Sequence, residues 1–119
     1  MVHPSLHDSG GWVCIEGMAA GRPIICLNLG GPAVQVTDDS GFRITADNPE
    51  QTTQAMTDAM VKLAQDADLR VSMGLAGRDI VQQNYSWNVV GQRLNEVYDK
   101  VVNEYERSDA HESTVVAQG

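Results

Sequence analysis

Apolar and polar positions follow two different periods along this chain, and each change of period marks a short strand or a helix. Between Gly11 and Ala20 the apolar positions fall at helical spacing. Gly21 then stands where a capping glycine ends a helix. Arg22–Leu29 is continuously apolar at its centre, which is typical of a parallel strand covered on both faces. The pattern therefore predicts a helix over 11–20 and a buried strand over 22–29.

Shorter patterns on either side add two strands and one small helix. Val2 and His3 have the character of a strand end, and Phe42–Thr45 alternates apolar and polar side chains as a half-exposed strand does. Pro32 suits the first position of a short helix over Ala33–Val36, because proline lacks the N–H that this position leaves unused. This alternation of strands and helices predicts a parallel sheet with helices on its faces.

Helices occupy the second half of the chain. The first is predicted to begin at Asn48, a capping residue, with Pro49 at its first position. The second is predicted over about Asp68–Gln83. It contains Gly74 and Gly77, which lower helix propensity but permit close packing against a neighbouring element.

A third helix is predicted after its cap, Ser86, with apolar side chains about 3.6 residues apart. These side chains are Val90, Leu94, Val97, Tyr98, Val101 and Tyr105. After about residue 106 the pattern dissolves, so residues 107–119 are predicted to form a disordered tail. The folded part, residues 1–106, is then a partial Rossmann-like α/β domain. Its short parallel sheet of about three strands precedes three C-terminal helices.

Composition narrows the class of protein. The 119 residues suffice for one small domain, and no apolar run approaches the length of about 20 residues that spans a bilayer. The net charge of −8 argues against nucleic acid as the main partner. Cys14 and Cys26 lie among apolar neighbours, so reduced thiols are favoured over a disulfide, and their spacing matches no metal site. We therefore expect a cytoplasmic protein without a signal peptide, a transmembrane segment or a bound metal.

Acidic and glycine residues gather where the predicted strands end. Asp8, Gly10 and Gly11 follow the first strand, and Gly30 and Gly31 follow the second. Ligands of parallel α/β sheets bind beyond the carboxyl ends of the strands, so we expect these residues to converge on one edge. The free N–H groups of a helix N-terminus suit a phosphate or a sugar oxygen there.

The same stretch contains a set of motifs in a fixed order. Asp8 and Glu16 are two acids separated by seven residues, followed by a small-residue helix end over 18–23 and by Gly30-Gly31-Pro32. Further motifs, among them Gly41-Phe42-Arg43-Ile44, Asn48-Pro49-Glu50 and Tyr85-Ser86-Trp87, continue to near Val101. This set resembles the C-terminal, donor-binding domain of retaining GT-B-fold glycosyltransferases in the glycosyl transferases group 1 family.

The resemblance implies a role for each matching position. Asp8 corresponds to the catalytic-site acid at the transferred sugar, and Glu16 to the acid that binds the ribose of the nucleotide. The positions that correspond to contacts with the sugar and phosphates are Ser9, Gly10, Gly11, Trp12, Gly30 and Gly31. The implied substrate is a nucleotide diphosphate sugar that donates a hexosyl group, with no metal or other cofactor.

Some positions depart from the family pattern. Asp8 stands where the family usually has Glu, Ser9-Gly10-Gly11 replaces Gly-Phe-Gly, and Val34 and Gln35 stand where an acid often follows the Gly-Gly-Pro loop. The family's N-terminal domain, with the acceptor site, and its phosphate-binding Arg and Lys have no counterpart in this sequence. We therefore expect a fragment that does not turn over substrate by itself and that needs the missing N-terminal domain as a partner.

Simpler interpretations stand beside these roles. Asp8 is also explained as an acid that favours the helix dipole, Glu16 as part of a solvated helix face, and Gly30-Gly31 as an ordinary turn. His3 and His7 are expected to be exposed and not catalytic. The alternative for the whole chain is a non-catalytic remnant that self-associates or binds nucleotide weakly. A short sheet with an unpaired edge favours a homodimer. For the full-length enzyme, peripheral association with a membrane is the alternative to a purely cytoplasmic location.

Overall fold

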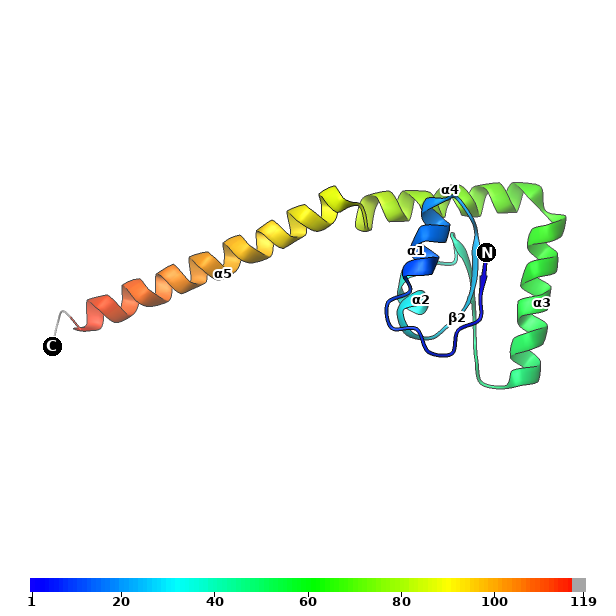
Figure 1. Ribbon diagram of the computed structural model, residues 1–119, viewed down its shortest axis with the longest axis horizontal. Coiled ribbons are helices and arrows are strands. Elements are labelled where there is room, and N and C mark those ends of the chain that lie inside the picture. The colour runs from blue at the N-terminus through cyan, green and yellow to red at the C-terminus, as the bar shows by residue number, and fades with distance from the viewer. Residues whose placement is uncertain (117–119) are drawn as a thin grey trace. The chain divides into compact units, whose positions relative to one another are not determined.

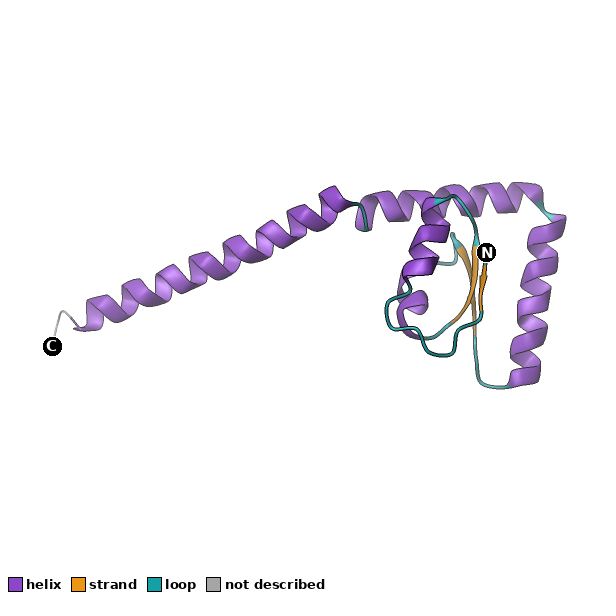
Figure 2. Ribbon diagram, viewed as in Figure 1, coloured by secondary structure: helices purple, strands orange, loops and turns teal. Residues whose placement is uncertain are grey.

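Eight helices and strands make up the part of the chain that the computed structural model describes, residues 1–116 (Figures 1 and 2). In chain order they are β1 (Val2–His3), α1 (Trp12–Ala19), β2 (Ile24–Leu27), α2 (Gly30–Gln35), β3 (Gly41–Ile44), α3 (Pro49–Gln65), α4 (Ala67–Asn84) and α5 (Trp87–Val116). The chain divides into two compact units, Met1–Tyr85 and Ser86–Gly119. The first unit contains the whole sheet.

The three strands form one parallel sheet in the order β1-β2-β3. His3 is in register with Cys26 across β1 and β2, and Cys26 is in register with Arg43 across β2 and β3. The N–H of Ile25 donates to the carbonyl of Met1 at 2.8 Å. The predicted fold, a short parallel sheet of three strands followed by three helices, is confirmed.

β2 is the centre of the first unit because all four of its residues are buried. Successive side chains of a strand point to opposite faces, so β2 supplies two apolar clusters. On one face Ile24 and Cys26 pack with Cys14, Ile15 and Met18 of α1 and with Val36. On the other face Ile25 and Leu27 pack with Met56, Ala59 and Leu63 of α3 and with Met73 of α4. Helices α1 and α3 therefore cover opposite faces of the sheet (Figure 1).

Two glycines allow α4 to pack closely against the helix–strand connection. A Cβ atom at Gly74 would lie 2.2 Å from the carbonyl oxygen of Gly21, and one at Gly77 would lie 3.1 Å from Cγ of Met18. Both glycines are buried. The predicted reason for glycine at these positions, close packing against a neighbour, is confirmed.

The largest boundary differences from the prediction in the first unit are at the second strand and the short helix after it. The second strand covers Ile24–Leu27 rather than 22–29, because Pro23 lacks an N–H for the ladder and Leu29 already caps the next helix. That helix, α2, begins at Gly30, three residues before its predicted start. The earlier start of α2 leaves only residues 28 and 29 between β2 and α2, and it draws the Gly30-Gly31 pair into the helix start.

The last helix is longer than predicted. Helix α5 continues to Val116, so the backbone over 107–116 is helical where the sequence predicted a disordered tail. Residues 92–116 contain neither proline nor glycine, so no helix breaker interrupts the helix there. Residues 117–119 of the predicted tail lie outside the described residues. Within residues 1–116, no helix combines the length and the apolar character needed to cross a bilayer.

Candidate functional site

Two loops meet at the carboxyl ends of β1 and β2. The N–H of Gly31 donates to the carbonyl of Asp8 at 2.9 Å. A Cβ atom at Gly30 would lie 2.2 Å from that same carbonyl oxygen, and one at Gly31 would lie 2.8 Å from the carbonyl oxygen of Ser9. Only glycine permits this approach of backbone to backbone. The structure therefore brings together the two loops that the sequence placed at one sheet edge.

The carboxylate of Asp8 is bonded within its own loop. Its Oδ1 accepts hydrogen bonds from the N–H groups of Gly10 at 3.1 Å and Gly11 at 2.8 Å, while Oδ2 lies 2.9 Å from Nε2 of His3. The bond from Gly11 is the largest influence that lowers the pKa of Asp8, and the bond from His3 lowers it further. Asp8 is therefore ionised at neutral pH, and three donors fix the direction of its side chain.

These bonds change which donors are available to a ligand. The N–H groups of Gly10 and Gly11, which the sequence analysis assigned to sugar and phosphate, are already bonded to Asp8. The next two N–H groups, those of Trp12 and Val13 in the first turn of α1, have no acceptor among residues 1–116. A helix leaves its first N–H groups without partners inside the helix, so these two donors are open at the helix N-terminus.

Gln35 fixes the other side of the Gly10–Gly11 turn. Its Nε2 donates to the carbonyl of Gly10 at 2.6 Å, and a Cβ atom at Gly11 would lie 2.3 Å from its Oε1. Gln35 is buried, with only 8% of its surface exposed, and its Oε1 has no hydrogen-bond partner within the described residues. In the sequence, Gln35 stands out only as a departure from a family pattern. A buried amide beside two glycines identifies it as a residue that holds the loop.

Trp12 and Glu16 share one face of α1. They are four residues apart, which places them one above the other on a helix. Trp12 is 68% exposed and Glu16 is also exposed, whereas Cys14 and Ile15 between them are buried against the sheet. The face that carries both predicted contact residues is thus turned to solvent, on the helix whose first turn offers the open N–H groups.

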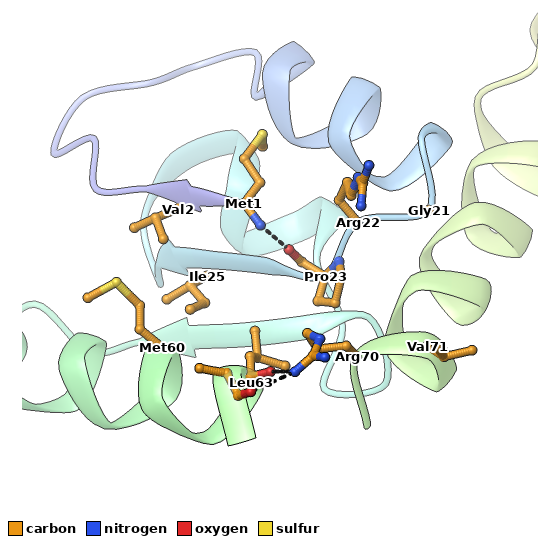
Figure 3. Close-up of a pocket in the computed structure, with 11 residues that line it drawn as sticks. Met1, Val2, Gly21, Arg22, Pro23, Ile25, Met60, Leu63, Arg70 and Val71 are labelled. Carbon is orange, nitrogen blue, oxygen red and sulfur yellow. Dashed lines mark hydrogen bonds between the residues drawn. The ribbon is translucent and has the colours of Figure 1, made fainter. Parts of the chain in front are cut away.

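A sizeable hollow lies elsewhere in the described structure. Its volume is about 610 Å³, and Figure 3 shows it between β1, β2, α3 and α4. Met1 and Pro23, which precede β1 and β2, line it together with apolar side chains such as Ile25 and Leu63. It therefore lies at the amino ends of the strands, and none of the predicted site residues lines it.

Two of the charged groups around that hollow, Arg70 and the amino group of Met1, are already bonded to backbone, and Arg22 also lines it. Arg70 donates to the carbonyl of Ala64 at 2.8 Å and to that of Leu63, and the amino group of Met1 donates to Pro23 (Figure 3). Arg70 thus caps the C-terminal end of α3. Among the side chains that the structure describes, no group of three or more His, Cys, Asp or Glu residues is arranged to hold a metal ion.

Comparison with known proteins gives a consistent result for the first unit. The sequence profile of the family described as glycosyl transferases group 1 matches residues 1–79. A D-inositol 3-phosphate glycosyltransferase from Corynebacterium aurimucosum is 33% identical over 96 residues, which cover 80% of this chain and 22% of that protein. Sucrose synthase 6 from Oryza sativa subsp. japonica is 30% identical over 94 residues, which cover 78% of this chain and 11% of that protein.

A solved structure shows the same fold. Sucrose-phosphate synthase from Thermosynechococcus elongatus superposes with a TM-score of 0.75 at 25% identity, over 87% of this chain and 25% of that one. The chain therefore spans a quarter or less of the length of each of these relatives.

Proposed function

The chain belongs to the glycosyl transferases group 1 family, and from this premise we propose that it forms the donor-binding part of a hexosyltransferase that uses a nucleotide diphosphate sugar. The observation that carries this proposal is the open first turn of α1 beside the joined loops at the sheet edge. Relatives named as glycosyltransferase and sucrose synthase support the sugar-transfer class.

The diphosphate is proposed to bind at the N-terminus of α1. The N–H groups of Trp12 and Val13 are open there, and the helix dipole favours an anion at this end. Gly30 and Gly31 carry no side chains and lie against the backbone of the Asp8 loop. A ligand would therefore meet only backbone atoms at this pair. Ser9 is exposed beside this turn. It supplies the hydroxyl group among the residues proposed to contact the donor.

The two acids are proposed to bind different parts of the donor. Glu16 is exposed on the same face of α1 as Trp12, and a carboxylate accepts two hydrogen bonds from a vicinal diol such as that of ribose. Asp8 is proposed to lie at the transferred sugar. Oδ1 already accepts two bonds, whereas Oδ2 accepts one from His3 and keeps a lone pair for a sugar hydroxyl.

Transfer itself is proposed to need a second domain. The relatives are more than four times as long as the matched segment, and the resemblance implies that the acceptor site lies in an N-terminal domain. We therefore expect the 119-residue chain to bind a donor without transferring its sugar. Donor-dependent sugar transfer by the isolated chain would contradict this expectation.

Tryptophan fluorescence tests donor binding. Trp87 is replaced by Phe so that Trp12 is the remaining indole, and UDP, GDP and their sugars are titrated. We expect saturable quenching of Trp12, with affinity reduced about tenfold in Glu16→Gln because a charge-assisted bond is lost. Glu96→Gln, an exposed acid on α5, is the matched control and should leave the affinity unchanged. No response to any nucleotide at millimolar concentration would favour the non-catalytic remnant.

A further inference from the structure

His3 of β1 and Asp8 of the following loop form a side-chain contact. We propose that His3 is a positioning residue for Asp8, holding one oxygen of its carboxylate from the sheet. Nε2 of His3 lies 2.9 Å from Oδ2 of Asp8, and the two side chains are 21% and 24% exposed. Sequence analysis placed His3 at a strand end and expected it to be an exposed histidine without a role.

The sheet determines where the imidazole lies. His3 is in register with the buried Cys26 of β2, and the Met1 carbonyl just before β1 accepts the N–H of Ile25. Residues in register across a sheet point to the same face, so His3 shares the face that α1 covers. The imidazole is therefore held by a paired strand, while Asp8 reaches it from the loop after Pro4.

The two carboxylate oxygens have separate partners. Oδ1 is held by the N–H groups of Gly10 and Gly11, which belong to the same loop as Asp8. Oδ2 is held by His3, which belongs to a different element. Without His3, the loop and its acid have no side-chain tie to β1, and the carboxylate rotates more freely about its terminal torsion. His3 thus fixes the Asp8 loop to the sheet beside the open turn of α1.

The same contact makes the charge at the loop depend on pH. A protonated imidazole makes the pair neutral, and a neutral imidazole leaves one negative charge. Cys14 of α1 and Cys26 of β2 are titratable groups on the packed elements, and burial raises the pKa of each thiol to about 11. Both thiols stay uncharged between pH 5 and 8. Arg43 lies on β3, and His7 lies in the same loop as Asp8.

A titration of the unmodified chain tests the contact directly. The side-chain carboxyl carbon of Asp8 and the amides of Gly10 and Gly11 are followed by NMR between pH 2 and 8. We expect the Asp8 carbon to show its own titration at low pH and a second inflection that coincides with the titration of the His3 ring. Absence of a second inflection while the His3 ring titrates would overturn the proposal.

Two variants separate the hydrogen bond from the charge. His3→Gln keeps an N–H donor, so it should retain the low Asp8 midpoint and lose the second inflection. His3→Val suits a strand but has no donor, so it should raise the Asp8 midpoint and also lose the inflection. His7→Gln is the matched control and should keep both features. If His3→Val folds with the Asp8 titration unchanged, the proposal is wrong; if it does not fold, the unmodified chain and His3→Gln still decide.

Donor binding adds a second readout, which rests on the proposed function. If the unmodified chain binds a nucleotide sugar, His3→Val should weaken binding about tenfold, and His3→Gln should weaken it less than threefold at pH 8. Equal affinity for the unmodified chain and His3→Val would overturn the positioning role. If no donor binds to any form, the proposed function fails, and the NMR titration alone decides the role of His3.

Discussion

Asp8 is short enough to turn back onto its own loop. A carboxylate that accepts the N–H groups two and three residues ahead is a common local motif for Asp. The acid spacing placed Asp8 correctly at the loop before α1. The partners of the carboxylate were not predictable, because His3 approaches from a strand whose register is set by β2 and not by local sequence.

Acid sensitivity is the first consequence of these bonds. The pKa of Asp8 is lowered in the folded state, chiefly by the bond from Gly11, so the folded state favours the ionised form. Its contribution to stability is present above the ordinary Asp range near pH 4, and it is lost as pH falls through the folded pKa. We therefore expect the urea midpoint to fall less steeply below pH 4 in Asp8→Asn than in the unmodified chain.

The control for this prediction is Asp47→Asn. Asp47 is exposed, in the loop before α3, and makes no hydrogen bond or ion pair within residues 1–116. Its replacement should leave the pH profile of the urea midpoint unchanged. Identical profiles for the unmodified chain and Asp8→Asn would contradict the role of the loop bonds in acid stability.

At the scale of elements, glycine sets the distance between α4 and the end of α1. Gly74→Ala would place Cβ 2.2 Å from a backbone oxygen that no rotamer change can move. We expect this substitution to lower the free energy of unfolding of the first unit by about 1–3 kcal/mol. Urea unfolding followed by circular dichroism measures the change.

Gly91→Ala is the matched control for this substitution. Gly91 also lies inside a helix, α5, but a Cβ atom there meets nothing within 4 Å. The change should raise the helix content of the second unit and leave unfolding of the first unit unchanged, because alanine favours a helix by up to about 1 kcal/mol over glycine. Equal behaviour of the two variants would contradict the close packing at Gly74.

The elements themselves were largely predictable, since they depend on local pattern. Asn48 caps α3 as predicted, accepting the N–H groups of Glu50 and Gln51 at 2.9 and 3.2 Å. Asp66 lies before the predicted start of the next helix at Asp68, yet it ends α3 and also caps α4 by accepting the N–H of Leu69 at 2.8 Å. Asp66 is the one residue between α3 and α4. So short a turn depends on how the two helices pack, and the local sequence pattern therefore overestimates its length.

At the scale of the whole molecule, the sheet has an unpaired edge. β1 pairs only with β2 within residues 1–116, and Val2, which is 44% exposed, lies on that edge beside the apolar hollow. The predicted homodimer would use this edge. We expect sedimentation to show a dimer, and we expect Val2→Lys to dissociate it. The control is Val34→Lys, which should leave the dimer intact because Val34 lies on α2 and is 81% exposed. A monomer at every concentration would contradict the prediction.

The parallel sheet was predictable because strands alternate with helices, and the site edge followed from it. The distribution of hydrogen-bond donors at that edge was not predictable. Gly10 and Gly11 are bonded to Asp8, Gln35 holds Gly10, and the open donors move on to Trp12 and Val13. The bonds to Asp8 are local, but the bond from Gln35 to Gly10 joins residues that are 25 positions apart, and no local pattern specifies it.

Amide chemical-shift mapping tests the proposed donor site most directly. The ¹⁵N-labelled 119-residue chain is titrated with UDP- and GDP-sugars, and every amide is followed. The account predicts saturable shifts at Trp12 and Val13, smaller shifts at Gly30 and Gly31, and none around the hollow lined by Met60 and Val71. Shifts confined to that hollow, or no shift at any amide at millimolar donor, would contradict it.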